Sequence, residues 1–121
     1  MSLHSTLTPS QYDEIVKFIR LTAKTNGFDR IFAEQEVDLL MGPLDGRIVT
    51  VAAAAGYPAG VVPLGFADDF NGRAYGVTIV AKAGREDRIF EAMSAWEKTM
   101  PGRKPPPLLR DWNVTKATSS L

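Results

Sequence analysis

Cysteine is absent from this chain of 121 residues, and histidine is nearly absent. Without cysteine there are no disulfides, no thiolate nucleophile and no cysteine-based zinc site. The single histidine, His4, lies near the N-terminus in a segment that we expect to be a solvated lead-in. A histidine-dependent triad or a multi-histidine metal site therefore cannot be built within one chain. We expect no metal and no cofactor.

An excess of charge and a long hydrophobic run are also lacking. Fourteen basic residues balance fourteen acidic ones, so electrostatics gives no reason to expect a nucleic acid or an anionic membrane as partner. The apolar runs at 39–44 and 48–55 fall short of the roughly 20 residues of a membrane-spanning helix. The N-terminus has no basic start followed by an apolar core, as a signal peptide would. We expect a cytoplasmic protein.

The composition that remains is that of a globular protein, with 45% hydrophobic residues. Its length predicts one domain. We place a single α/β domain at residues 1–102 and a Pro-rich, flexible tail at 103–121, because three consecutive prolines begin at Pro105. Deleting this tail should cost little stability.

The N-terminal third carries helix signals. Thr8 is suited to cap a helix, Pro9 to occupy its first position, and Gln11 to reach back to the Thr8 amide. Apolar residues then recur at helical spacing up to a stop signal at Asn26-Gly27. A short second helix is predicted at 28–35, with Ile31 and Phe32 facing inward.

The middle of the chain predicts strands around a helix. Residues 37–41 are typical of a buried central strand, and the alanines within 48–55 favour a helix that Gly56 and Pro58 end. Residues 60–66 and 73–82 predict a β-hairpin with Asn71-Gly72 in its turn. Pro63 cannot donate a sheet hydrogen bond, so we expect it at an edge or a bulge.

A last helix is predicted to begin within residues 84–87. Its apolar side is a single stripe made by Ile89, Met93, Trp96 and Met100. Together these signals predict an α/β fold with a small three-stranded mixed sheet, a β-hairpin and about four helices.

Five segments of the chain, taken in their order along the sequence, resemble the C-terminal region of the amidase-signature family, which hydrolyses or transfers amides. The resemblance is clearest over residues 37–98. Its segments are Val-Asp-Leu-Leu-Met-Gly-Pro at 37–43, Ile-Val-Thr-Val-Ala-Ala-Ala-Ala-Gly-Tyr-Pro at 48–58, Val-Val-Pro-Leu-Gly at 61–65, Tyr-Gly-Val-Thr-Ile-Val-Ala at 75–81, and the helix-like run at 86–97.

The resemblance implies a Ser-Ser-Lys mechanism, but nothing in this chain matches the family's catalytic lysine or its Gly/Ser-rich signature. No serine lies in a Gly-rich loop whose amides could hold an oxyanion. The serines are Ser2, Ser5, Ser10, Ser94, Ser119 and Ser120. We therefore name no catalytic residue and expect no amidase turnover from the chain alone.

Three residues are candidates for substrate binding. In family members that bind a substrate ammonium, an acid can precede the Ala-rich helix, and Asp45 lies about one residue from that place. The alternative is a turn-forming Asp-Gly pair with a charge at the helix N-terminus. In the family, the residues that correspond to Gly56 and Tyr57 lie close to the pocket floor. The alternative is that this segment only ends a helix before a strand, which requires a Gly and a Pro in any case.

Two other motifs have simple interpretations. Asp68-Asp69 lacks the spacing and the final Glu of a calcium loop, so a polar hairpin tip is favoured over a metal site. Asn113-Val-Thr matches the glycosylation sequon, but no secretion signal accompanies it.

Three functional hypotheses remain open. The first is an amidase-like protein without turnover of its own, which self-associates or complements another chain through an open sheet edge or a bare apolar face. The second is an amide hydrolase completed in trans by another chain. The third is a module that binds a small amide or a protein. We expect a homo-oligomer or a complementing protein partner.

Overall fold

The computed structural model describes residues 6–106 and 109. His4, Trp112 and the sequon at Asn113 lie outside the described residues, as does most of the predicted tail. No helix in the described part is long and apolar enough to cross a membrane.

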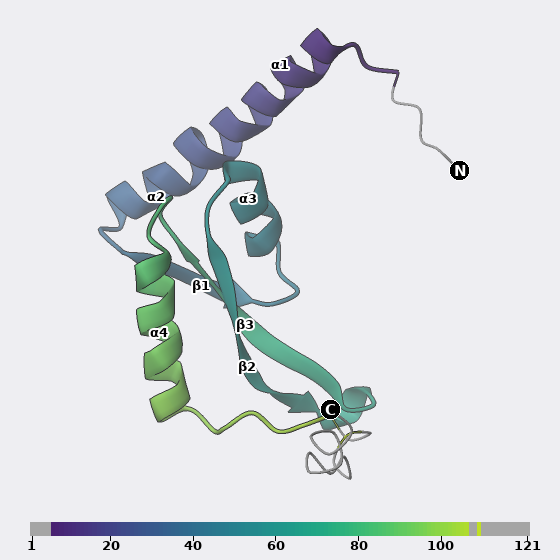
Figure 1. Ribbon diagram of the computed structural model, residues 1–121, viewed down its shortest axis with the longest axis vertical. Helices are drawn as coiled ribbons and strands as arrows, with labels where there is room; N and C mark the ends of the chain where they lie inside the picture. Colours follow the sequence, from purple (N-terminus) through teal and green to yellow (C-terminus); the bar gives the residue numbers. More distant parts are fainter. Residues whose placement is uncertain (1–5, 107–108, 110–121) are drawn as a thin grey trace, which may run out of the picture.

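A continuous helical rod forms the N-terminal third (Figure 1). It consists of α1 (Pro9–Arg20), a π-helical stretch (Leu21–Phe28) and α2 (Asp29–Glu34). The predicted capping box is present: the Gln11 amide donates to Thr8 Oγ1 over 3.3 Å, and the Thr8 amide donates to Gln11 Oε1 over 2.9 Å. The predicted stop at Asn26-Gly27 is wrong. The π-helical turn passes through both residues and delivers Phe28 and Phe32 to the core, so tertiary packing outweighs the local signal.

The sheet has three strands, β1 (Leu39–Pro43), β2 (Ala59–Ala67) and β3 (Arg73–Ala81), in the order β1-β3-β2. The α/β class is confirmed, but the expected mixed sheet is wrong because both neighbouring pairs are antiparallel. β1 and β2 run in the same direction, joined by α3 (Ile48–Ala55), and β3 inserts between them. Because β3 lies between them, the parallel strands β1 and β2 do not pair with each other.

The strand predicted to be central is an edge strand. β1 is half-buried, with Met41 52% exposed, whereas β3 occupies the centre and is fully buried from Thr78 to Ala81. On the other edge, β2 has its register shift between Pro63 and Gly65, as expected for a strand that contains proline.

The hairpin connection contains the turn that the sequence predicts. Asn71 and Gly72 have φ values of 54° and 70°, after a short 3₁₀ turn at Asp68–Phe70. The left-handed backbone at both residues matches the preference of Asn-Gly for such turns.

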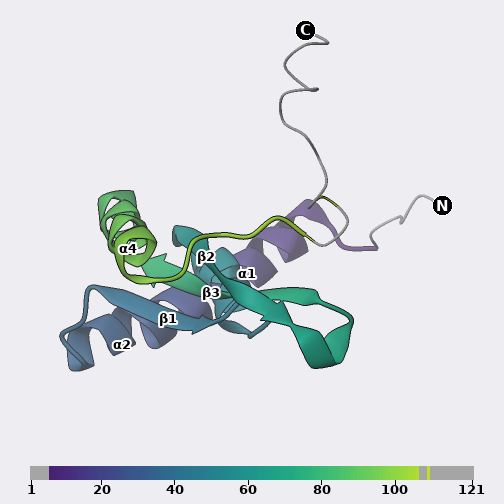
Figure 2. The ribbon, with the colours of Figure 1, turned by 90° about the horizontal axis from the view of Figure 1, so that it is seen from below.

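Apolar residues pack on both faces of the sheet. One cluster joins the rod, α3 and β3 and comprises Phe28, Phe32, Ala52, Ala55, Tyr57 and Val80. The other packs α4 (Glu86–Thr99) on β2 and β3 and comprises Val62, Ile79, Ala81 and Ile89. Val80 and Ile79 point to opposite faces because strand side chains alternate. Figure 2 shows α4 and α2 on opposite sides of the strands.

The predicted stripe of α4 faces the sheet. Ile89 is buried, Met93, Trp96 and Met100 are half-buried, and the Trp96 indole donates to the Pro63 carbonyl over 2.9 Å. In α2 the expectation is only half right. Phe32 is 1% exposed, whereas Ile31 is 39% exposed and does not face inward.

Candidate functional site

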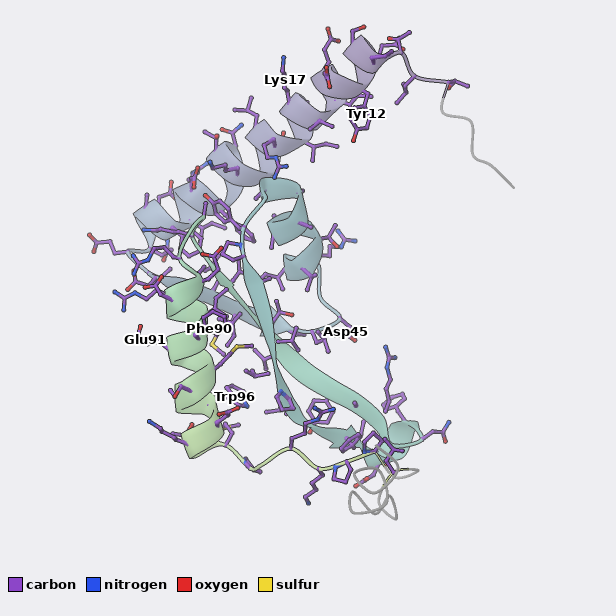
Figure 3. All side chains as sticks on the ribbon, viewed as in Figure 1. Tyr12, Lys17, Asp45, Phe90, Glu91 and Trp96 are labelled. Carbon is purple, nitrogen blue, oxygen red and sulfur yellow. The ribbon has the colours of Figure 1, made fainter. Side chains whose placement is uncertain are left out.

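Asp45 borders an open groove of about 360 Å³ between the turn after β1 and the hairpin. Asp45 is exposed and lies in the turn that connects β1 to α3 (Figure 3). The groove combines an apolar lining with one acidic side chain at Asp45 and one basic side chain at Arg73. Its lining residues are Leu44, Asp45, Ala67, Phe70, Arg73, Ala74, Tyr75 and Gly76. Such a groove offers a carboxylate acceptor beside apolar walls to a small ligand.

The fold builds this groove from distant parts of the chain. The amide of Leu44 donates to the Gly76 carbonyl over 3.0 Å, which holds the turn against β3. Gly46 then donates to the Pro43 carbonyl over 3.0 Å and closes the turn around Asp45. The sequence pointed to Asp45 but not to Phe70 and Arg73. These two residues reach the groove because the hairpin folds back beside β1, and no local pattern encodes that approach.

Gly56 and Tyr57 do not line the Asp45 groove. Gly56 ends α3 in the left-handed conformation, at φ 72°, and its amide donates to the carbonyls of Ala52 and Ala53. Tyr57 is 7% exposed and stacks on Phe28 with ring centroids 5.8 Å apart. The Tyr57 hydroxyl donates to Asp29 Oδ1. The structure thus places Tyr57 in the core and Asp45 at the surface, and their role in substrate binding stays a prediction.

A second groove, of about 450 Å³, lies between the hairpin and the segment after α4. Residues 101–106 run back along the hairpin from the end of α4 (Figure 1). Arg103, Lys104 and Pro106 therefore line this groove together with Phe66 and Tyr75. The beginning of the predicted tail is thus placed against the sheet.

Both serines within residues 6–106 lie on helices. Ser10 lies in the first turn of α1, with its hydroxyl 3.2 Å from Thr8 Oγ1. Ser94 is exposed on α4. Neither lies in a Gly-rich loop. Within the same part of the chain, no three His, Cys, Asp or Glu residues gather as a metal site would require.

The clearest electrostatic perturbation lies at the start of α4. Arg85 donates to both carboxylate oxygens of Asp87 over 2.9 Å, and both side chains are exposed. This hydrogen bonding lowers the pKa of Asp87 and raises that of Arg85. The pair lies at the start of α4, and neither residue lines the two grooves.

Comparison with known proteins relates the fold to amidases. No protein-family model matches the chain, and no curated protein sequence matches it. Native peptide amidase from Stenotrophomonas maltophilia is similar in structure, with a TM-score of 0.72 and 28% identity over 87% of this chain. The crystal structure of PAM12A is similar with a TM-score of 0.73 and 27% identity over 85% of this chain. The chain spans 23% of the length of each of these proteins.

The described fold is therefore similar to part of an amidase. At this coarse level, the likeness to peptide amidase supports the resemblance to the amidase-signature family that the sequence segments indicated.

Proposed function

We propose that this chain forms one part of an amidase-type fold and takes part in amide hydrolysis only together with the rest of that fold. One observation carries the proposal: the match covers 87% of this chain but 23% of peptide amidase. The rest of the fold would supply the Ser-Ser-Lys residues, which have no counterpart in this sequence.

The chemistry of amide hydrolysis supports a catalytic part that lies outside this sequence. Cleaving the C–N bond needs an activated nucleophile and donors for the oxyanion. Ser10 and Ser94 lie on helices, away from any loop that presents several amides. Asp45, in contrast, presents an exposed carboxylate beside an apolar groove. We propose that Asp45 binds an ammonium or N–H group of a small amide substrate, while the rest of the fold performs catalysis.

Activity measurements test the proposal. The chain alone is incubated with small aliphatic and aromatic amides and with a serine-reactive fluorophosphonate. It is then mixed with a peptide amidase from which the matching quarter has been deleted. We expect neither turnover nor stoichiometric labelling from the chain alone, and turnover above that of the truncated enzyme from the mixture. Turnover by the chain alone, or a mixture no more active than the truncated enzyme, would contradict the proposal.

A further inference from the structure

Helix α1 has an apolar side that nothing in the described structure covers. None of its residues is buried. Tyr12, Ile15, Phe18 and Ile19 are 60%, 43%, 68% and 44% exposed, and we call these four residues the α1 stripe. Their spacing places them on one side of the helix, and Figure 3 shows Tyr12 and Lys17 on opposite sides. The helix is thus amphipathic, but its apolar side faces solvent.

The position of α1 explains why the stripe is bare. The N-terminal part of the helix extends beyond the sheet and α3 (Figure 1), although α1 still contacts α3. Its C-terminal end approaches the body, where the Arg20 guanidinium lies against Gly56. Val16, which lies next to the stripe at four residues from Tyr12 and three from Ile19, is half-buried. The stripe therefore does not close over the sheet.

The size of the stripe argues against a second copy of the chain as its occupant. An aromatic side chain offers about 150–250 Å². At the observed exposures, the stripe leaves about 400 Å² of side-chain surface accessible. Two such helices face to face would bury about 800 Å² in total, which is below the roughly 1,200 Å² at the low end of stable interfaces. A groove that encloses the helix from both sides would bury more of it.

We propose that the α1 stripe docks in an apolar groove of the part of the amidase-type fold that lies outside this chain's match. This inference rests on the proposed function. Tyr12, Ile15 and Ile19 lie at positions i, i+3 and i+7, which is the spacing of a helix bound in a groove. About three quarters of peptide amidase lies outside the match, which is enough chain to form such a groove.

The test compares two variants with equal changes of net charge. Ile15→Glu/Phe18→Glu puts two charges into the stripe, and Lys17→Glu makes the same change on the polar side. All three positions are exposed, so both variants should keep the melting temperature and circular dichroism of the wild type. Each full chain carries a tag and is co-expressed with untagged peptide amidase from which the matching quarter has been deleted.

We expect the truncated amidase to co-purify one to one with the wild type and with Lys17→Glu, and at least tenfold less with Ile15→Glu/Phe18→Glu. Equal recovery with all three chains would overturn the inference, as would no recovery with the wild type. Light scattering of the wild type alone, across a hundredfold dilution, should give a constant monomer mass. A dimer that Ile15→Glu/Phe18→Glu dissociates would assign the stripe to a second copy and also overturn the inference.

The outcomes separate this inference from the proposed function. A complex that depends on the stripe but hydrolyses no amide would sustain the docking and refute the proposed function. Restored turnover that is insensitive to Ile15→Glu/Phe18→Glu would sustain the proposed function and refute the docking.

Discussion

The Tyr57 hydroxyl donates to Asp29 Oδ1, which links the residue after the α3 C-cap to the first residue of α2. The Tyr57 ring stacks on Phe28 and lies 6.2 Å from the Phe32 ring, centroid to centroid. One side chain therefore joins the helical rod to α3 by both packing and a hydrogen bond. The residue that the family resemblance suggested for a pocket floor stabilises the core.

Tyr57→Phe should lower the free energy of unfolding by about 1.5–3 kcal/mol, because a hydrogen bond to a charged group is lost while the ring remains. Urea denaturation followed by circular dichroism measures the change. Tyr12→Phe, which removes a hydroxyl from a side chain 60% exposed, serves as control and should change stability little. Equal stability of Tyr57→Phe and the wild type would show that the hydrogen bond contributes nothing.

Thr78→Val should leave stability unchanged or raise it by about 1 kcal/mol. Thr78 is fully buried in β3, and its Oγ1 has no hydrogen-bond partner in the described part of the chain. Valine keeps the branched shape and removes the cost of burying a hydroxyl. Thermal denaturation measures the effect, with the exposed Thr50→Val as control. A clear loss of stability would reveal an unrecognised partner of this hydroxyl.

Gly56→Ala and Gly84→Ala should destabilise the protein by similar amounts, because both glycines have φ values near +70°. Each alanine costs about 1–2 kcal/mol for the left-handed backbone. A Cβ at Gly84 would meet open space, whereas one at Gly56 would displace the guanidinium of the exposed Arg20, the far end of a flexible side chain. Urea denaturation measures the two free energies of unfolding. A clearly larger loss for Gly56→Ala would mean that the contact between Arg20 and α3 contributes to stability.

Asp45→Asn should raise the KM of the complemented assembly about tenfold for amides that carry an ammonium group, because a charge-assisted hydrogen bond is lost. The turnover number should change little. Asp69→Asn at the hairpin tip is the matched control. If KM is unchanged and only the melting temperature falls, Asp45 acts as the turn-forming residue that the sequence also suggested.

The Asp87 carboxyl should titrate below its ordinary pKa of 3.8, because it accepts hydrogen bonds from Arg85. A lowered folded-state pKa gives a contribution to stability that is present above the unfolded-state value and is lost as the pH falls through the folded-state value. A carbon-13 NMR titration measures this pKa. Arg85→Ala should return it toward 3.8, and no movement would assign the shift to another cause.

Short-range signals in the sequence determined the ends and turns of elements. The Thr8–Gln11 capping box, the Gly56 cap and the Asn71-Gly72 turn were predicted and are present, because each depends on residues within one turn of the chain. The stripe of α4 was predicted for the same reason: helical periodicity is local.

Only the tertiary structure decided which strand is central, where the rod ends and what lines the grooves. β3 follows β1 by about thirty residues, yet it separates β1 from β2. The rod continues through Asn26-Gly27 because this places Phe28 and Phe32 in the core, where their rings pack against Tyr57. Phe70 and Arg73 line the same groove as Asp45, although they are distant from Asp45 in the sequence. These outcomes depend on contacts between distant residues, whose free energies outweigh local propensities of about 1 kcal/mol.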